Sequence, residues 1–401
     1  MDPAVITLCV LAVAAFLFVT ELIPLAVTAM AACTALGILG VLPSKQVYAG
    51  LSNSTVVLFG GMFVIGAAMF KTGLAEAIGV AVVKEAGTNQ VPLMAAIMLV
   101  TIVLSSVSSN TGTVACLMPV IIGICQAAKI SPSKELMPLA IAANVGGTIT
   151  MIGTPPNVIV TGALSAAGLP TFGFFEFAYI GIPLSIIVFF FTLFIGRHLL
   201  PANAAGEMDE EAIRAAAEEA GASGEDSEPK STTKMWISGL IMIGVVICMA
   251  LDLQTLPLQT AAVTGAILCV ITGCLKEKEA YAGIDWVTIF LFAGMLSVAT
   301  AMEKTGAGKL IADTVVGSMG EHPNAVVLCA VLYLISNVLT HFMSNIAASS
   351  LLAPIGISIA QSIGADPKPV LMAIGIAASM AFATPMATPP NTLVLGPGGF
   401  T

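Results

Sequence analysis

Two stretches rich in serine, threonine and asparagine lie at the centres of the two longest uncharged parts of the chain. The first is Ser105–Thr113 (SSVSSNTGT), inside the uncharged run 86–128, and the second is Leu339–Ser350 (LTHFMSNIAASS), inside the run 323–365. Hydroxyl and amide groups provide neutral oxygen atoms and N–H donors, which can coordinate a small hard cation or hydrogen-bond a carboxylate. Both stretches therefore predict ion binding without a fixed charge from the chain.

Each half of the chain also contains a Thr-Pro-Pro-Asn string within an apolar run. Gly153–Asn157 reads GTPPN in the run 136–175, and Ala387–Asn391 reads ATPPN in the run 369–401. Two successive prolines interrupt a helix, because proline lacks an N–H and clashes with the preceding turn. A break inside a span gives half-helices, whose N-termini attract an anion. The alternative is a simple proline kink, which two copies at related positions disfavour.

The composition requires that these segments lie in a membrane. Of the 401 residues, 9% are charged and 57% are hydrophobic, and the mean hydropathy is +1.01, whereas soluble domains carry about 25% charged residues. We expect an all-α polytopic membrane protein, long enough for about ten spans of roughly 20 residues. The net charge of −9 and the absence of a basic segment argue against nucleic acid as a partner.

The sequence offers few residues for enzymatic chemistry. It has three histidines and eight cysteines, and the cysteines form no CxxC pair. Only His341 falls in a polar stretch, either as a helix residue with a backbone or water partner or as a protonatable group. Neither polar stretch contains Asp or Glu, which disfavours a proton antiporter that titrates a carboxylate. We therefore predict a transporter and no enzyme.

The uncharged runs predict the helical segments. Residues 4–20 follow an acidic N-terminus, so we expect a retained span and no secretory signal. The runs 86–128 and 323–365 are each long enough for two full spans or for one re-entrant hairpin with its tip in mid-membrane. Irregular backbone is tolerated there only where it lines a cavity or is covered by protein. Composition alone leaves both alternatives open, and the paired Pro-Pro strings favour the hairpins.

The chain contains an internal repeat. Five pairs of strings match at separations of 233 to 235 positions: Pro24-Leu25 with Pro257-Leu258, Gly61-Met62 with Gly294-Met295, Lys71-Thr72-Gly73 with Lys304-Thr305-Gly306, Ser109-Asn110 with Ser344-Asn345, and Thr154–Asn157 with Thr388–Asn391. If the hairpins re-enter, five crossings precede the linker, and an odd number inverts the second copy. A cytoplasmic linker then places ten of the 14 Lys and Arg residues inside, in agreement with the positive-inside rule.

These patterns define the expected domains. Residues 201–234 form a polar, acidic, cytoplasmic linker, in which the composition allows a short helix over 208–219. The other expected parts are a first scaffold segment (1–85), a first transport segment (86–200, with hairpin 86–128 and broken helix 136–175), a second scaffold segment (235–322) and a second transport segment (323–401, with hairpin 323–365 and a broken helix from 369). No counterpart of the span 177–196 follows the second copy, so we expect that a last helix is missing.

Together these motifs resemble the divalent-anion:sodium symporter family, which includes sodium-coupled dicarboxylate, citrate and sulfate carriers. The resemblance rests on TELIPLAVTA (20–29), the KTG string at 71–73, the paired Ser-Asn stretches and the paired TPPN strings. It implies an elevator-type transporter of two inverted repeats, in which a scaffold mediates homodimerisation in the cell (inner) membrane and a mobile domain carries the hairpins and broken helices. The resemblance also implies Na⁺ as the coupling ion.

The resemblance assigns the site residues by position. The first Na⁺ site would use Ser105, Ser109, Asn110 and the Gly153 carbonyl, and the second would use Thr340, the Met343 carbonyl, Asn345 and the Ala387 carbonyl. The residues implied at the substrate are Ser109, Asn110, Thr111, Thr154, Pro155, Ser344, Asn345, Ile346, Thr388 and Pro389. At Ile346 this chain departs from the family, whose tips read Ser-Asn-Thr in both copies. A hydrogen bond to a charged ligand contributes about 1.5–3 kcal/mol, so this change predicts altered binding of a dicarboxylate.

The expected function is secondary transport of a di- or tricarboxylate in a membrane of lipid. A dianion meets no fixed cation in these stretches, and its transfer into a low dielectric is costly without compensation. Bound Na⁺ and helix dipoles could compensate the negative charge, and transport would then be coupled to sodium. The alternatives are sodium-independent anion exchange, for example with protonated His341, and carriage of another ion such as sulfate, arsenite or a cation exchanged for protons. The sequence does not select the anion.

Overall fold

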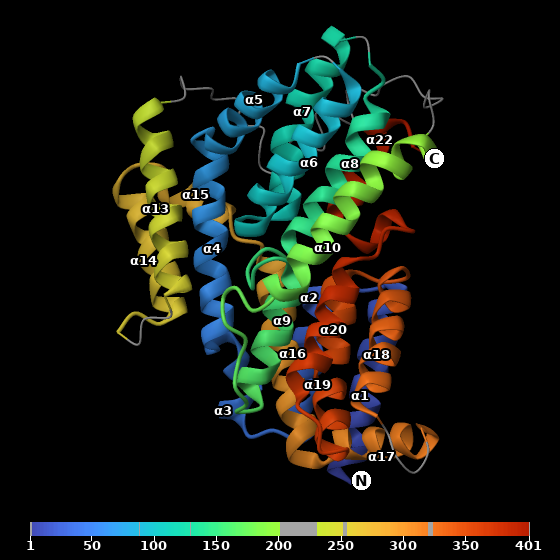
Figure 1. Ribbon diagram of the computed structural model, residues 1–401. Helices are drawn as coiled ribbons and strands as arrows, with labels where there is room; N and C mark the ends of the chain where they lie inside the picture. The colour runs from blue at the N-terminus through green and yellow to red at the C-terminus, as the bar shows by residue number, and fades with distance from the viewer. Residues whose placement is uncertain are drawn as a thin grey trace. The chain divides into compact units, whose positions relative to one another are not determined.

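The computed structural model describes residues 2–87, 89–128, 130–200, 231–251, 255–319 and 324–400, and all regular structure in these ranges is helical (Figure 1). The all-α fold expected from the composition is therefore confirmed. Most of the predicted linker, with its suggested helix over 208–219, lies outside the described residues. Helix α13 (Thr232–Ala250) begins inside the predicted linker 201–234. Residues 232–234 are therefore helical and belong to α13.

Six of the described helices are long and apolar enough to cross a membrane by length and composition. They form because long uncharged runs of Leu, Ile, Val, Ala and Phe satisfy every backbone polar group within one helix, which a bilayer requires. They are α1 (Pro3–Thr20), α4 (Ser54–Lys71), α6 (Gln90–Val107), the helical stretch Ala178–Leu199, α13 and α16 (Trp286–Thr305).

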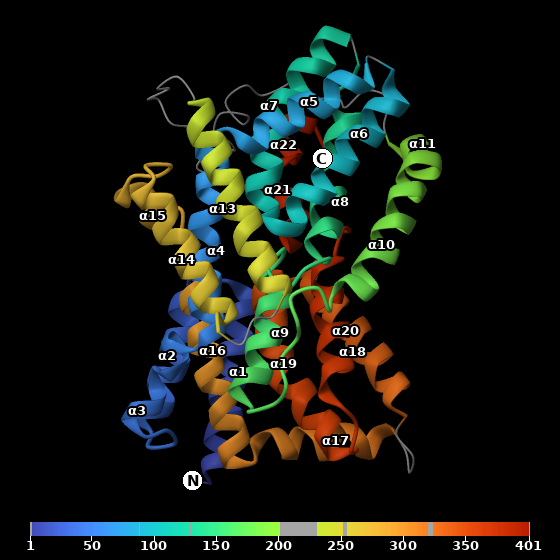
Figure 2. The same cartoon turned by 60° about the vertical axis from the view of Figure 1, so that its left-hand side comes forward.

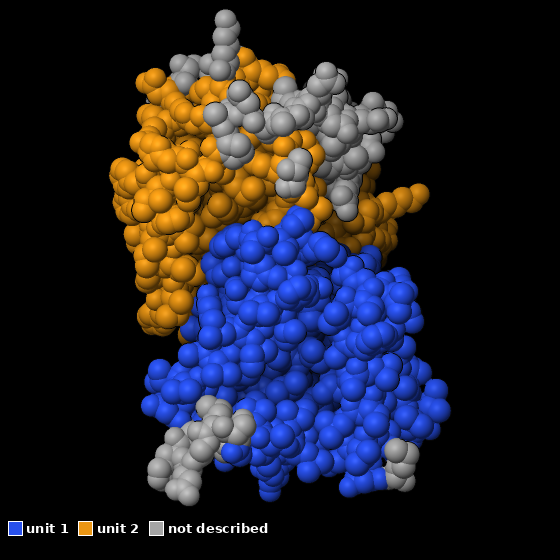
Figure 3. Space-filling model, turned by 90° about the vertical axis from the view of Figure 1, so that its right-hand side faces the viewer, with its two compact units in different colours: residues 1–60, 155–173, 285–387 blue, residues 61–154, 174–284, 388–401 orange. Residues whose placement is uncertain are grey.

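The described chain folds into two compact units, each containing segments from both sequence halves (Figure 3). Unit 1 comprises residues 1–60, 155–173 and 285–387, and unit 2 comprises residues 61–154, 174–284 and 388–401. The chain changes unit immediately before the Pro-Pro pair of the first TPPN string and immediately before the threonine of the second. The predicted division into scaffold and transport segments follows other boundaries and stays a prediction.

Unit 1 is built around α16 and α19. Helix α16 packs along α2, while α19 packs on α9, α17 and α20. Phe18, Leu36, Leu291 and Met295 are buried in one apolar core of this unit. Besides α1, part of α4 and α16, unit 1 contains α2 (Leu25–Ile38), α3 (Ser44–Val47), η1 (Ala49–Ser52), α9 (Pro155–Ala166), α17 (Ala307–Met319), α18 (Ala325–Thr340), α19 (Asn345–Ser362), α20 (Pro367–Ser379) and η3 (Pro385–Ala387).

Unit 2 is built around α8, which packs on α6, α7, α10 and α21. Met94 and Met98 of α6 and Ala142 of α8 are fully buried in a core that also includes Leu193. Besides the rest of α4, α6 and α13, unit 2 contains α5 (Leu74–Ala86), α7 (Asn110–Ala128), α8 (Ser133–Gly147), α10 (Ala178–Phe191), η2 (Thr192–Gly196), α11 (Arg197–Leu199), α14 (Leu258–Ile271), α15 (Glu277–Ala282), α21 (Pro389–Leu393) and α22 (Leu395–Gly398).

Both polar stretches are turns between two helices, and both TPPN strings separate two helices. Helix α6 ends at Val107 and α7 begins at Asn110, while α18 ends at Thr340 and α19 begins at Asn345. Likewise α8 ends at Gly147 before α9, and α20 ends at Ser379 before α21. The helix interruptions thus lie where the prolines predict them. The depth of the turns in a membrane stays a prediction.

Each unit contains a close helix–helix contact between positions that the sequence repeat relates. A Cβ added to Gly61 of α4 would lie 2.8 Å from the backbone carbon of Ala262 in α14, and a Cβ added to Gly294 of α16 would lie 2.8 Å from that of Ala29 in α2. Small residues allow such close approach of helix backbones, which stabilises helix pairs in membranes. In both units, a helix of one sequence half packs on a helix of the other half.

Each lysine of the two Lys-Thr-Gly strings binds a residue of the other sequence half. Lys71 forms an ion pair with Glu279 at 3.3 Å, and Lys304 donates to the side-chain oxygen of Gln46 at 2.6 Å. Each pair joins residues of different halves, and the pairs are related by the offset of the repeat. A hydrogen bond from the Lys276 N–H, helped by Lys71, holds the pKa of Glu279 below its ordinary value. The predicted inversion of the second copy in the membrane is not tested by these contacts.

Alanine at Gly294 should destabilise the protein, because its methyl group would collide with the backbone of α2. Overpacking of this kind costs about 1–3 kcal/mol, more than alanine gains in helix propensity. Thermal unfolding of the detergent-purified chain measures the effect. The matched control is Gly244→Ala in α13, where nothing lies within 4 Å of the added carbon. An equal or higher stability for Gly294→Ala than for the control would contradict the importance of the contact.

Candidate functional site

Unit 2 gathers polar groups from its hairpin turn, the end of α8 and the loop before α9. The Ser105 hydroxyl at the end of α6 donates to the Ala143 carbonyl of α8 at 2.8 Å. Ser105 is fully buried and Asn110, the first residue of α7, is 8% exposed. The cluster forms because the turn at Ser108 brings the ends of α6 and α7 to the same face of α8.

Several oxygen atoms converge on one terminal atom of the Asn110 amide. The Ser105 hydroxyl lies 2.5 Å from this atom, the Gly153 carbonyl 2.9 Å and the Ala143 carbonyl 3.2 Å. The favourable assignment places the amide nitrogen here, where it donates to both carbonyls. With the amide oxygen turned inward, four oxygen atoms would face one another, and a cation would be needed between them. The arrangement thus brings together three of the four residues predicted for the first Na⁺ site.

The backbone around this cluster leaves room only for glycine. A Cβ at Gly147, the last residue of α8, would lie 2.4 Å from the Asn110 amide, and a Cβ at Gly153 would lie 2.5 Å from the Gly147 carbonyl. Any side chain at these positions would displace the amide or the loop. The two glycines therefore allow the loop before α9 to pass directly against the turn.

Asn144 connects α8 to the second TPPN string. Its amide nitrogen donates to the Thr388 hydroxyl at 3.0 Å and to the side-chain oxygen of Asn391 at 2.9 Å. Asn144 and Thr388 are each 1% exposed. This residue of the first sequence half therefore fixes the string of the second half within unit 2. Asn144 was not among the predicted site residues. An asparagine inside an otherwise apolar helix could have indicated it.

Three buried oxygen atoms near the turn of unit 2 have no hydrogen-bond partner among the described residues. They are the hydroxyls of Ser108 and Thr113 and the side-chain oxygen of Asn144. Buried polar atoms are normally satisfied, so an unsatisfied group requires an explanation such as a bound water or ion. The two hydroxyls can coordinate a cation or donate to an anion, whereas the amide oxygen can only accept a hydrogen bond or coordinate a cation.

The hairpin turn of unit 1 is fixed to the end of α20 by Asn337. Its amide nitrogen donates to the carbonyls of Ala377 at 3.2 Å and Met380 at 3.3 Å. Both carbonyls lie at the C-terminal end of α20, where the Ala377 carbonyl also accepts from the Met380 N–H at 3.2 Å. Asn337 thus caps α20 before the second TPPN string. No sequence pattern had predicted a role for Asn337.

His341 ties the same turn to the loop after α20. Its Nδ1 lies 2.6 Å from the Asn337 carbonyl, and its Nε2 accepts from the Ala383 N–H at 3.2 Å. The structure therefore shows His341 with backbone partners on both ring nitrogens, which was the first of the two alternatives.

The residues predicted for the second Na⁺ site are less closely joined. The Thr340 hydroxyl donates to the Ser336 carbonyl at 2.7 Å, and Met343, Asn345 and Ala387 are buried. No hydrogen bond in the described part of unit 1 connects the Asn345 side chain to Thr340 or Ala387. These four residues therefore share unit 1, but the described side chains form no joint cluster like that of Ser105, Asn110 and Gly153.

The residues predicted for the substrate divide between the units. Ser109, Thr111, Thr154, Thr388 and Pro389 lie in unit 2 with Asn110, while Pro155, Ser344, Asn345 and Ile346 lie in unit 1. Ser109 and Ser344 stand at the N-terminal ends of α7 and α19, and Ser344 accepts from the Ala347 N–H at 3.2 Å. Both turns thus present a helix N-terminus, which favours negative charge. Ile346 instead packs on the apolar core of unit 1.

Comparison with known proteins assigns the chain to a group of transporters. A profile described as citrate transporter matches residues 15–367. The chain belongs to the citrate transporter family. It is a membrane transporter and no enzyme, and the suspected kinship with sodium-coupled anion carriers is confirmed at the level of the family.

Characterised and uncharacterised relatives support this assignment. An uncharacterised transporter of Haemophilus influenzae is 29% identical over 98% of this chain and 85% of its own length. The sodium-dependent dicarboxylate transporter SdcS of Staphylococcus saprophyticus is 25% identical over 99% of this chain and 81% of its own. The sodium-dependent high-affinity dicarboxylate transporter 3 of Caenorhabditis elegans is 26% identical over 97% of this chain and 77% of its own length.

A solved structure supports the fold. It is the YdaH transporter of Alcanivorax borkumensis, whose topology is described as unusual. The two structures match over 88% of this chain and 80% of the YdaH chain, with a TM-score of 0.54 and 16% sequence identity. At this identity the likeness concerns the fold alone. The family member described here therefore shares its helical architecture with a known transporter.

Proposed function

We propose that this protein is a secondary active transporter for a C4-dicarboxylate such as succinate or malate, or for citrate, coupled to Na⁺. The proposal includes an elevator mechanism, a homodimer in the cell (inner) membrane and a cytoplasmic linker 201–234. The observation that carries it is the convergence of the Ser105 hydroxyl and the Ala143 and Gly153 carbonyls on the Asn110 amide. These neutral oxygen atoms can bind a cation that arrives with the substrate.

The cation is expected to replace the hydrogen bonds of the Asn110 amide. When Na⁺ enters, the amide turns, and its oxygen joins Ser105 and the Gly153 carbonyl as ligands. Ser109 would complete the first site, and Thr340, the Met343 carbonyl, Asn345 and the Ala387 carbonyl would form the second. Neutral oxygen ligands hold a monovalent ion weakly enough to be released at the end of transport.

The bound cation prepares the protein for a dianion. The turns and the TPPN strings contain no Lys or Arg, so the chain itself offers only helix N-termini and N–H or O–H groups to a carboxylate. We place carboxylate contacts at Ser109, Asn110 and Thr111, at Ser344, Asn345 and Ile346, and at the strings through Thr154, Pro155, Thr388 and Pro389.

Transport in proteoliposomes tests the substrate. Labelled succinate, citrate and sulfate are each offered to liposomes preloaded with the same unlabelled anion, so that counterflow reports binding and translocation. We expect counterflow with succinate or citrate and little with sulfate. Counterflow of sulfate alone would reject the carboxylate proposal, and no counterflow of any anion would reject anion transport.

Threonine at position 346 should raise the affinity for a dicarboxylate. A new hydroxyl beside Asn345 can donate to a carboxylate oxygen, and such a bond contributes about 1.5–3 kcal/mol, or about a tenfold or larger decrease in KM. The measurement is the KM for succinate. The control is Ile355→Thr, because Ile355 packs on the same apolar core outside the turn. Equal changes in both variants would assign the effect to packing.

A further inference from the structure

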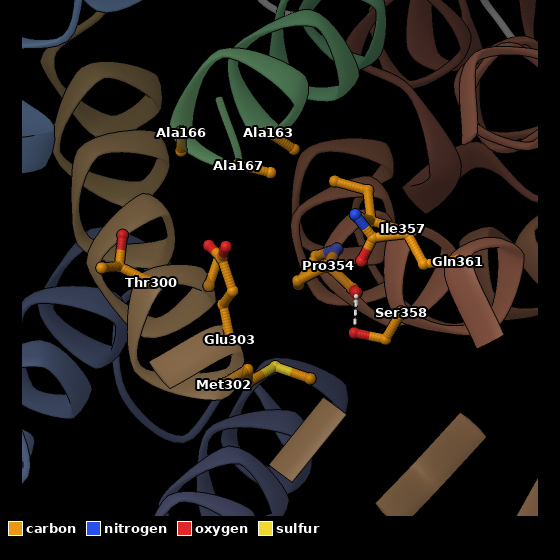
Figure 4. Close-up of a pocket in the computed structure, with 11 residues that line it drawn as sticks. Ala163, Ala166, Ala167, Thr300, Met302, Glu303, Pro354, Ile357, Ser358 and Gln361 are labelled. Atoms are coloured by element: carbon orange, nitrogen blue, oxygen red, sulfur yellow. Dashed lines mark hydrogen bonds between the residues drawn. The ribbon is translucent and has the colours of Figure 1, made fainter. Parts of the chain in front are cut away.

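One carboxyl group of unit 2 is buried outside the predicted ion and substrate sites. It belongs to Glu135 in the first turn of α8, and it is the only buried carboxyl among the residues whose side chains the structure describes. Glu303 of unit 1, by comparison, is exposed and points into a pocket between α9, α16 and α19 (Figure 4). Glu135 precedes the uncharged run 136–175 and lies in neither polar stretch. It therefore needs an explanation of its own.

Neither oxygen atom of the Glu135 carboxyl has a hydrogen-bond partner among the described residues. Three N–H groups of the first turn are already used by the backbone. The Lys134 N–H donates to the Ser131 carbonyl at 3.2 Å, and the N–H groups of Glu135 and Leu136 donate to the Pro132 carbonyl at 2.9 Å. These donors, which often hold a carboxylate at the start of a helix, are therefore not directed to this one.

The helices that pack on α8 supply no positive charge to Glu135. These are α6, α7, α10, α21 and α22, and their sequences contain no Lys, Arg or His. Their titratable residues are Cys116 and Cys125 of α7 and Tyr179 of α10, and the Cys125 thiol is near enough for the charge of Glu135 to act on it. Lys134 is the neighbouring basic residue on α8 itself, and it forms no ion pair with Glu135 in the described structure. An ionised Glu135 would thus be buried without a compensating partner.

Burial of this kind favours the protonated acid. Transfer of a carboxyl out of water penalises its charged form far more than its neutral form. Burial accordingly raises the pKa of Glu135 to about 8, although the positive charge of Lys134 opposes the change. Glu135 is therefore neutral in the folded protein at a pH at which an ordinary carboxyl is ionised.

Segments of both sequence halves cover the start of α8. Helix α7 of the first half and α22 of the second half both pack on α8 (Figure 2). The Ser133 hydroxyl, two residues before Glu135, donates to the Gly398 carbonyl of α22 at 2.7 Å, and Ser133 is 4% exposed. A carboxylate at position 135 requires hydration. Water reaches this position only when the packing of these helices loosens.

We propose that Glu135 is a proton-binding site of unit 2, and that its protonated carboxyl stabilises the packing of α7 and α22 on the start of α8. Release of the proton leaves a buried carboxylate without a partner and weakens this packing. The ligand is a proton, and the site makes the stability of unit 2 sensitive to pH. It is independent of the proposed substrate and of Na⁺ coupling.

The pH dependence of thermal unfolding of the detergent-purified chain tests the proposal. A carboxyl with a higher pKa in the folded than in the unfolded chain binds more protons when folded, so its contribution to stability is lost as the pH rises. This window extends from 4.5, the ordinary pKa, to about 8. We expect the Tm of the wild type to fall across this window more than that of Glu135→Gln, whose amide stays neutral. At about pH 8, Glu135→Gln should unfold at a higher temperature than the wild type.

The matched control is Glu277→Gln, because Glu277 is an exposed carboxylate of α15 in the same unit. This variant should retain the pH dependence of the wild type. The same pH dependence in Glu135→Gln as in the wild type would overturn the proposal. Stabilisation by Na⁺ or K⁺ at about pH 8 in the wild type, but not in Glu135→Gln, would overturn it as well, because a metal cation would then occupy the carboxyl.

Infrared spectroscopy detects the proton directly and needs only the wild type. A protonated carboxyl absorbs as a C=O stretch that is separate from the carboxylate bands, and ordinary carboxyls are ionised near pH 7. We expect this absorption in the folded wild type near pH 7 and its reversible loss above about pH 8. Glu135→Gln should lack it wherever that variant folds. Its absence from the folded wild type near pH 7 would show that Glu135 is ionised and would reject the proton site.

Discussion

Alanine at position 110 should lower carboxylate uptake by at least about tenfold while the protein still folds and inserts. The Ser105 hydroxyl and the Ala143 and Gly153 carbonyls all converge on the Asn110 amide. Its removal deletes one proposed cation ligand and takes the Asn110 donor away from the Gly153 and Ala143 carbonyls, of which Ala143 keeps the hydrogen bond from the Ser105 hydroxyl. A bond to a charged ligand contributes about 1.5–3 kcal/mol, and about 1.4 kcal/mol corresponds to a factor of ten.

The measurement is initial uptake of succinate or citrate by proteoliposomes with equal amounts of reconstituted protein. Ser106→Ala is the matched control, because the Ser106 hydroxyl belongs to the same turn region but donates only to the Val103 carbonyl of its own helix, at 2.8 Å. Normal uptake by Asn110→Ala would show that the cluster of unit 2 has no part in transport. Equal losses in Asn110→Ala and Ser106→Ala would indicate general distortion of the turn.

Replacement of external Na⁺ by choline should abolish uptake driven by an inward sodium gradient. The hairpin turns and TPPN strings contain no Lys or Arg, so a dianion in this environment meets only dipoles and neutral groups. The electrostatic cost of an uncompensated charge in low dielectric amounts to many kcal/mol. A small hard cation bound to oxygen ligands offsets this cost, and the large quaternary ammonium ion cannot enter the cluster.

Uptake is measured at fixed pH and fixed total salt while Na⁺ is exchanged for choline. Ser105→Ala provides an internal test, because it removes one proposed ligand and should raise the Na⁺ concentration for half-maximal uptake with little effect at saturating Na⁺. Undiminished uptake in choline would reject sodium coupling and favour exchange of anions. A changed substrate affinity with an unchanged Na⁺ dependence in Ser105→Ala would remove this residue from the cation site.

Local sequence patterns carried the prediction of the helices and their interruptions. A long uncharged run can satisfy its backbone in a membrane only as helix, and a Pro-Pro pair removes two N–H donors wherever it occurs. The ends of α8 and α20 therefore lie before the TPPN strings, and the turns lie at the two Ser-Asn pairs. The family could likewise be suspected from these strings, because their order along the chain is specific.

The amino-acid sequence alone thus determined a helical membrane transporter with two hairpin turns and two interrupted helices. Only the tertiary structure decided which half supplies each partner: Asn144 of the first half binds Thr388 and Asn391 of the second, and Lys304 binds Gln46. Local periodicity describes which face of a helix is apolar, but it holds no information on the distant segment that covers this face. The same limit hid Asn144 and Asn337, because a polar side chain in an apolar helix acquires a function only from the atoms that surround it in the folded chain.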